Sequence, residues 1–225
     1  SYSVNTTAGF SIIRYLGNGT ADHTIPHHLG AEPHWIIIKQ LTGTYDWRVY
    51  FKLEGNQKIV RLNTTGTASS STDYWNNTTP TSTVFNLGTG GGVNADDVPY
   101  IAYCFAPKTG YSKIGKYTGN GNADGPFVYT GFKPSLIIFK DTDNAENWFI
   151  FDNKRPGYNL NANHLNPNSD TTETNSSANT LDILSNGFKM RATNNGINRS
   201  GGQGFNYLAI GQSTVGSNNV PATAR

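Results

Sequence analysis

The sequence is poor in charge, and its few charged residues do not gather. Only 14% of the 225 residues are Asp, Glu, Lys or Arg, and the formal net charge is +2. The 17 basic residues are scattered without a Lys/Arg run. A protein that tracks nucleic acid needs a basic stripe along the phosphates, so we expect no nucleic-acid partner.

Long apolar runs are also missing, and cysteine occurs once. No stretch approaches the about 18 consecutive apolar residues of a membrane-spanning helix, so we expect no membrane insertion. The chain opens with SYSVNTT, which has neither the charged region nor the apolar core of a signal peptide. A single cysteine excludes an intrachain disulfide. Cys104 lies in the apolar segment YIAYCFA, where burial raises a thiol pKa, so we expect a packing role rather than a nucleophile.

The short motifs that mark common catalytic centres are absent. The sequence has no GxSxG, no HExxH and no phosphate-binding loop. Asp96 and Asp97 are neighbours in a Gly/Asn-rich segment, which does not place two carboxylates across a cleft, as glycoside hydrolysis requires. We therefore predict a non-enzymatic protein with no catalytic residues and no cofactor.

Two groups of residues suggest a metal site, but neither has the required pattern. His23, His27, His28 and His34 are close in sequence, yet neighbours on a strand, such as His27 and His28, face opposite sides. The segment DTDNAEN (141–147) is rich in oxygen ligands. It lacks the sixth-position glycine and the distant glutamate of a calcium loop. We predict no metal site.

What the sequence does contain is a long internal repeat. YLGNGTAD begins at Tyr15 and YTGNGNAD begins at Tyr117, and GNG predicts a tight hairpin connection in both. The flanking segments follow the same order, because LGAEPHWIIIK resembles TGFKPSLIIFK and YDWRVYF resembles ENWFIFD. Farther on, PYIAYCF resembles FNYLAIG. We therefore divide the chain into two copies of one unit, 1–108 and 109–225.

Segments of strand length alternate with turn signals along the chain. GFSIIRY, HWIIIKQ, DWRVYF and VPYIAYCFA are rich in β-branched and aromatic residues. In DWRVYFK the alternation places Trp47 on one face and Arg48 and Tyr50 on the other, as in a half-solvated strand. The uninterrupted run at 35–38 predicts a central strand covered on both faces. The predicted fold is all-β: two tandem homologous antiparallel β-sandwich units packed together, with few or no helices.

Aromatic residues make up 12% of the chain, and several lie among neutral polar residues. Aromatic rings stack on sugar faces, while Asn, Asp and Thr bond to sugar hydroxyls. A place in the core fits Trp75, in TDYWNNTT, equally well. The polar segment 156–182 is long for a loop, which is typical of a binding surface. The ligand-binding residues predicted on this basis are Tyr74, Trp75, Asn76, Asp96, Asp97, Asn198 and Arg199.

The ordered set of motifs resembles a known family. GNGTAD, HTIPHHLGAEPHWIIIK, YWNNTTPTSTVFNLG, YIAYCFA and YTGNGNADGPFVYTGFKPSLIIFKDTDNAENWFIFD together resemble the duplicated β domain found toward the ends of tailed-bacteriophage tail fibres, especially in marine and cyanobacterial phages. The usual HGLG turn of that family is His27-His28-Leu29-Gly30 here. The resemblance implies a virion surface protein, a homotrimer, that takes part in adsorption. It supplies no motif for catalytic or receptor residues.

These observations predict a tail-fibre module on the virion surface that recognises a host-surface glycan or receptor and contacts other virion tail proteins. One alternative is a structural virion component, such as a capsid decoration or a tail-joining protein. A second is a capsule-degrading enzyme, which would release reducing ends from host polysaccharide. A third is a secreted lectin, suggested by N-glycosylation sequons at Asn18, Asn63 and Asn77, although the lack of disulfides counts against it.

Overall fold

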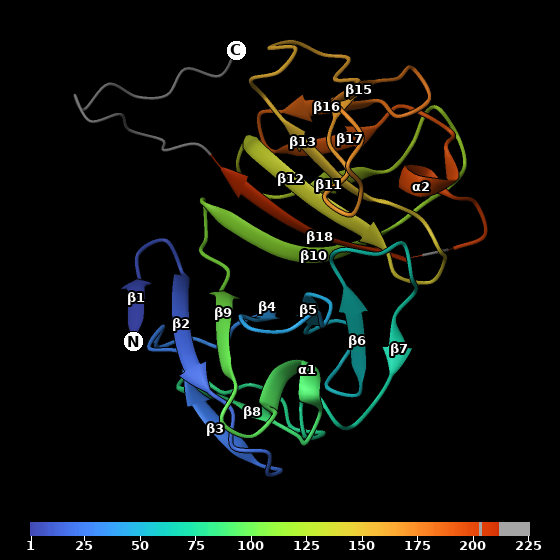
Figure 1. The fold of residues 1–225 in the computed structure, drawn as a ribbon. Helices are drawn as coiled ribbons and strands as arrows, with labels where there is room; N and C mark the ends of the chain where they lie inside the picture. Colours follow the sequence, from blue (N-terminus) through green and yellow to red (C-terminus); the bar gives the residue numbers. More distant parts are fainter. Residues whose placement is uncertain (203, 212–225) are drawn as a thin grey trace. The chain divides into compact units, whose positions relative to one another are not determined.

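The computed structural model describes residues 1–202 and 204–211 and confirms the all-β fold. Within these ranges two short helices accompany eighteen strands (Figure 1). The chain divides into two compact units, Ser1–Lys108 (unit 1) and Thr109–Arg225 (unit 2). The predicted second copy ends at residue 225, and its last part, 212–225, lies outside the described residues. No helix of the described ranges is long and apolar enough to cross a membrane.

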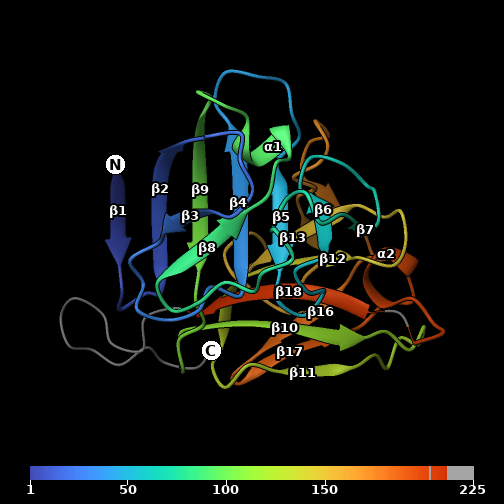
Figure 2. The same ribbon diagram turned by 90° about the horizontal axis from the view of Figure 1, so that it is seen from below.

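Unit 1 is built on one large antiparallel sheet. Its seven strands follow one another in the order β1 (Tyr2–Asn5), β2 (Phe10–Leu16), β9 (Pro99–Phe105), β4 (Trp35–Gln40), β5 (Arg48–Phe51), β6 (Lys58–Arg61) and β7 (Ser69–Ser70). A separate ladder joins β3 (His23–Pro26) to β8 (Val84–Leu87). The helix α1 (Gly91–Asn94) lies against β4, at the end from which the β4–β5 loop rises (Figure 2).

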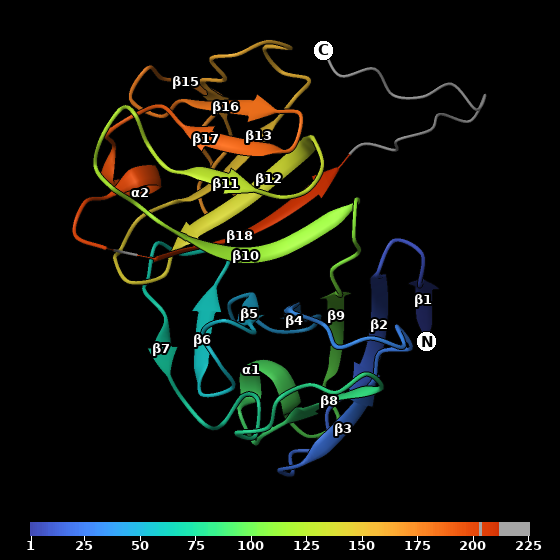
Figure 3. The ribbon, with the colours of Figure 1, turned by 180° about the vertical axis from the view of Figure 1, so that it is seen from behind.

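Unit 2 has a four-stranded sheet and a three-stranded sheet. The first follows the order β10 (Ser112–Thr118), β18 (Gly204–Gly211), β12 (Pro134–Asp141) and β13 (Trp148–Asp152), and the second β11 (Phe127–Tyr129), β17 (Gly187–Met190) and β16 (Leu181–Leu184). Figure 3 shows the second sheet lying across β12 and β13. A small ladder joins β14 (Asn163–His164) to β15 (Thr174–Asn175), and α2 (Asn195–Asn198) contacts β12.

In each unit the core lies between the larger sheet and the smaller one. In unit 1, Ile36 and Cys104 of the large sheet join Ile25 and Phe85 of the β3–β8 ladder in one buried cluster. In unit 2 the corresponding cluster combines residues of both sheets, such as Phe139 and Phe188. Full burial of each such side chain stabilises the fold by about 2 kcal/mol.

The prediction for the uninterrupted apolar run is confirmed, whereas that for the next strand is wrong. β4 lies between β9 and β5, with Trp35 and Ile36 fully buried. β5 is not half-solvated, because all four of its residues are buried. Tyr50 packs edge-on against Trp75 at 5.4 Å, and Arg48 packs against Gly92 of α1. Alternation along one strand does not reveal what covers its polar face.

We expect Cys104 to be unreactive while unit 1 is folded. Its side chain is fully buried, and burial raises the pKa of the thiol. Because the thiolate is the reactive species, alkylation by iodoacetamide near neutral pH should be at least about 100-fold slower than in denaturant. Mass spectrometry of timed samples measures this ratio. A native rate close to that of the unfolded chain would contradict the placement of Cys104 in the core.

Candidate functional site

The first GNG turn is held by a buried asparagine at the end of α1. Asn94 is fully buried, and its Nδ2 donates to the carbonyl oxygens of Thr20 and Gly88, both at 2.8 Å. Its Oδ1 accepts from the backbone N–H of Asn18 at 3.0 Å, and His23 Nδ1 lies 2.8 Å from the same oxygen. One side chain therefore fixes the turn against the helix, although the two are far apart in sequence.

The same contacts occur in unit 2, where Asn198 takes this place. Asn198 Oδ1 accepts from the Asn120 N–H at 2.8 Å, and Nδ2 donates to the carbonyl oxygens of Asn122 and Ala192 at 2.8 and 2.9 Å. Asn198 was predicted to bind ligand. Because it is fully buried and its amide is already hydrogen-bonded on both atoms, that prediction is corrected: Asn198 supports a turn.

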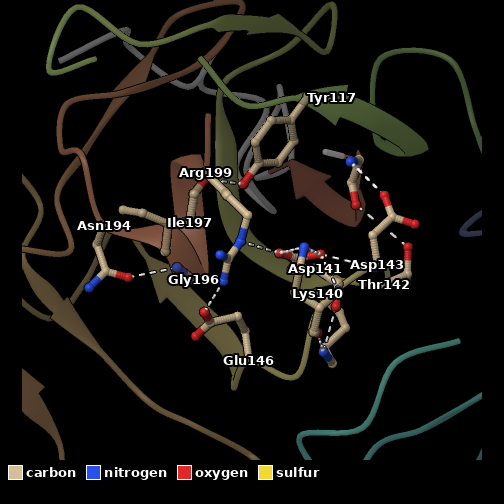
Figure 4. Close-up of polar contacts among 12 residues, drawn as sticks. Tyr117, Lys140, Asp141, Thr142, Asp143, Glu146, Asn194, Gly196, Ile197 and Arg199 are labelled. Atoms are coloured by element: carbon tan, nitrogen blue, oxygen red, sulfur yellow. Dashed lines mark hydrogen bonds and ion pairs between the residues drawn. The ribbon is translucent and has the colours of Figure 1, made fainter. Parts of the chain in front are cut away.

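The first residue of each repeated octet reaches the same helix. The hydroxyl groups of Tyr15 and Tyr117 donate to the carbonyl oxygens of Val93 and Ile197, each at 2.7 Å. Figure 4 shows Tyr117 directed at Ile197 in this way. Burial raises the pKa of both phenols, so both hydroxyls stay protonated and keep donating at ordinary pH. The octet is therefore structural in both units.

Arg199, another predicted ligand residue, belongs to a closed ionic network (Figure 4). Its guanidinium pairs with Asp141 at 3.4 Å and with Glu146. The fully buried Asp141 also accepts from the backbone N–H groups of Asp143 and Asn144, at 2.9 and 3.0 Å. Two carboxylates of the 141–147 loop, those of Asp141 and Glu146, therefore already pair with Arg199. Asp141 also fixes the backbone of this loop. Among residues 1–202 and 204–211, no three His, Cys, Asp or Glu side chains form a group that could hold a metal ion.

A lysine fixes the same loop in each unit. Lys140 Nζ donates to the carbonyl oxygens of Asp141 and Asn144, and burial lowers its pKa to about 8 against the opposing influence of nearby carboxylates. In unit 1, Lys39 Nζ donates to the carbonyl oxygens of Gly43 and Tyr45, at 3.2 and 2.6 Å. The lysine of unit 1 thereby anchors the backbone that carries an exposed aromatic ring.

The remaining polar residues predicted to bind ligand lie on the surface of unit 1. Asp96 and Asp97 are exposed, and Asp97 has a left-handed backbone with φ 54°. Asp96 packs beside Gly19 of the repeated turn, where a Cβ on the glycine would lie 3.1 Å from the Asp96 Cβ. Asn76 donates to Asp22 Oδ1 at 3.3 Å. The structure therefore brings Asn76 and Asp96 near the same turn, within reach of solvent.

The two predicted aromatic residues differ in exposure. Trp75 is buried, and its Nε1 donates to the Lys58 carbonyl oxygen at 2.9 Å. No face of its indole is free for a sugar, so its predicted binding role is corrected to the core role. Tyr74 is half-buried and lies 5.1 Å from the Arg48 guanidinium, measured from its ring centroid to Cζ.

The structure adds two residues to Tyr74 that the sequence prediction did not select. We call Tyr45, Arg48 and Tyr74 the tyrosine–arginine cluster. Tyr45 is 47% exposed, and its ring centroid lies 6.0 Å from the Arg48 Cζ. A Cβ on Gly91 would lie 2.9 Å from the Tyr45 hydroxyl, and one on Gly90 would lie 3.2 Å from the Tyr74 ring. The glycine-rich turn lets both rings approach the arginine.

One signal in the sequence could have identified Arg48. When Trp47 is aligned with Trp148, Arg48 stands opposite Phe149, which is a core residue of unit 2. A charged residue at the position of a core aromatic residue indicates a local function or a local partner.

The long polar segment at 156–182 contains some regular structure. It contains β14 and β15, and an isolated bridge joins Asn161 to Leu181. Arg155, just before it, pairs with Asp152 at 2.7 Å and with Glu173. Of its two rings, His164 is buried and Tyr158 is 74% exposed. The segment therefore offers a single exposed ring without a second ring beside it.

A family model described as "Domain of unknown function (DUF7483)" matches residues 1–213, which is nearly the whole chain. No curated protein and no solved structure matches the sequence.

Proposed function

We propose that this chain, which belongs to the family of the DUF7483 domain, is a non-enzymatic carbohydrate-binding module of a phage tail fibre. In this role it sits on the virion surface, contacts other tail proteins as a homotrimer, and takes part in adsorption to a host-surface glycan. The phage setting is supported by the motif resemblance described for the sequence. The binding activity is supported by the tyrosine–arginine cluster.

The observation that carries the proposal is the pair of tyrosine rings beside a glycine-rich turn. Aromatic rings offer sugars a flat apolar face at little cost in side-chain entropy. The Tyr45 backbone is anchored by Lys39, and Tyr74 is packed against the core of unit 1. Both rings are therefore held in place before a ligand arrives, and such preorganisation favours binding.

The first experiment is binding of the labelled chain to bacterial and cyanobacterial cells, with and without periodate treatment of their surface polysaccharide. We expect periodate-sensitive binding. Tyr45→Ala and Tyr74→Ala should each weaken it about tenfold, which corresponds to the loss of one stacked ring. Tyr158→Ala is the matched control, because this tyrosine is also exposed but has no partner ring in its segment.

Two results would contradict the proposal. One is cell binding that periodate does not affect, and the other is equal loss in the Tyr45→Ala and Tyr158→Ala variants. Complete absence of cell binding would favour a structural virion component. That second candidate is supported by Phe127 and Tyr129, which are 46% and 59% exposed on the edge strand β11. Apolar rings on an open edge suit contact with another protein chain.

A further inference from the structure

Arg48 is a buried cation whose donors are poorly used. Its side chain is only 7% exposed, and Nη1 donates to Asp46 Oδ2 over a long 3.4 Å. The buried Nε has no hydrogen-bond partner among the described residues. Asp46 is also shared, because its Oδ2 pairs with Arg61 at 3.4 Å and its Oδ1 accepts from Asn63 at 3.0 Å. Its carboxylate therefore neutralises Arg48 only in part.

The fold does not need a cation at this position. A Cβ on Gly92 of α1 would lie 2.7 Å from the Arg48 Nε, and a Cβ on Gly196 of α2 would lie 2.9 Å from the Phe149 ring. Both side chains thus pack against a helical glycine in the corresponding place of their units. In unit 2 an apolar ring fills that place without any buried charge. The arginine of unit 1 leaves donors unsatisfied where a phenyl ring would not.

The guanidinium of Arg48 is the group of the cluster that can attract an anion, whereas the tyrosine ring faces stabilise the cation itself. The guanidinium lies near two tyrosine rings, at 6.0 Å from Tyr45 and 5.1 Å from Tyr74. A second cation, Lys39, donates to the carbonyl oxygens of Gly43 and Tyr45. A planar guanidinium matches a carboxylate, which can accept two parallel hydrogen bonds from it. Phosphate and sulfate groups have similar acceptor geometry, so the experiment must separate them.

We infer that the tyrosine–arginine cluster binds an acidic sugar, whose ring stacks on the exposed Tyr45 and whose carboxylate pairs with Arg48. This inference rests on the proposed glycan-binding function and names the class of sugar. It assigns the terminal Nη donors of Arg48 to the ligand, whereas Nε stays buried against Gly92 of α1. Asp46 then acts as the competing carboxylate that holds the guanidinium in place when no sugar is bound.

The test compares acidic polysaccharides with their own carboxyl-reduced forms. The probes are polygalacturonate, alginate and polysialic acid, each before and after chemical reduction of the carboxyl groups, together with neutral dextran and sulfated dextran. Binding of the full chain is measured by biolayer interferometry at about 50 and 200 mM salt. We expect at least one acidic polymer to bind at least about tenfold more tightly than its reduced form, and more weakly at the higher salt concentration.

Variants assign the preference to Arg48. Arg48→Phe installs the ring that unit 2 carries at this position, and it should remove the preference for the acidic polymer. Arg48→Lys keeps the charge without the planar fork and should retain part of the preference. Arg14→Gln is the matched control, because it removes the same charge from an exposed position on β2, and it should bind like the wild type. Circular dichroism verifies that each variant is folded.

Each other outcome is informative. The inference is overturned if acidic and reduced polymers bind equally, if sulfated dextran alone binds, or if folded Arg48→Phe keeps the preference. If Arg48→Phe does not fold, two measurements still test the inference. They are the comparison of each polymer with its reduced form and the binding of the Arg48→Lys variant. Equal binding of neutral and acidic polymers would leave the proposed glycan-binding function intact. No binding to any polysaccharide or cell would overturn both.

Discussion

Asn94→Asp should lower the free energy of unfolding of unit 1 by about 4 kcal/mol at neutral pH. Asn94 Nδ2 donates to three oxygen atoms, those of Asn18 Oδ1, the Thr20 carbonyl and the Gly88 carbonyl. A carboxylate has no hydrogen to donate, so it would place a negative charge among three oxygens. The position is fully buried, and water cannot take over these contacts. Urea unfolding monitored by fluorescence measures the loss.

The loss should depend on pH. Burial among oxygen atoms raises the folded-state pKa of the introduced carboxyl above about 3.9, its value in an unfolded chain. A group whose folded pKa is raised has its full stability below the unfolded pKa and loses stability as pH rises through the folded pKa. The destabilisation should therefore be smallest near about pH 4 and grow toward about pH 7. Faster alkylation of Cys104 should accompany it, because that thiol lies in the core of unit 1.

Two further variants serve as references for Asn94→Asp. Asn198→Asp should cause a similar loss in unit 2, because Asn198 Nδ2 donates to Asn120, Asn122 and Ala192 in the same arrangement. Asn5→Asp changes an exposed side chain whose Oδ1 accepts from the Ala8 N–H at 2.9 Å, and a carboxylate keeps that role. Its effect should stay within about 0.5 kcal/mol. Equal effects of Asn5→Asp and Asn94→Asp would show that the buried network contributes little.

The sequence was informative wherever a local pattern determined the structure. The uninterrupted apolar run from Trp35 predicts a central strand, and β4 is one. The adjacent residues Trp35 and Ile36, which point to opposite faces, are both fully buried. The alternation at Arg48 and Tyr50 predicted exposure, and this was wrong. What covers these residues comes from the 73–92 region, and no pattern within the strand reports on so distant a segment.

In the candidate site too, the sequence revealed local turn chemistry but not the contacts made by distant segments. The repeated octet showed that a turn recurs, but the predicted tight hairpin at GNG is wrong. β3 pairs with β8 and β11 with β17, so each GNG turn joins strands of two different sheets. The anchor of the first turn, Asn94, lies 76 positions from Asn18, and nothing local to the turn identifies it. Asn198 was therefore selected as a ligand residue although it is the anchor of the second turn. The aromatic content selected Tyr74 and Trp75 alike. Their exposure separates them, because Tyr74 is half-buried and Trp75 is buried, and exposure depends on tertiary packing.

Gly17→Ala should cost about 3 kcal/mol or more of the free energy of unfolding of unit 1. A Cβ at this position would lie 2.1 Å from the carbonyl oxygen of Ala95, far inside van der Waals contact. The glycine cannot move away easily, because its N–H donates to the Val98 carbonyl at 2.8 Å and its own carbonyl accepts from the Asp97 N–H at 3.1 Å. Urea unfolding measures the loss, and Gly119→Ala tests the equivalent contact, 2.3 Å from the Arg199 carbonyl oxygen.

Gly30→Ala is the control that separates the close approach at Gly17 from the other reason for a glycine, a positive φ. Gly30 has φ +68°, but a Cβ there would meet nothing within 4 Å. Alanine at Gly30 should therefore cost only about 1 kcal/mol, the strain of the left-handed backbone. Gly17 does not have a positive φ, so a larger loss there must come from the collision with the segment after α1. If Gly30→Ala proves the more costly change, the close approach of the Ala95 carbonyl does not require a glycine at Gly17. The turn is then held by Asn94 alone.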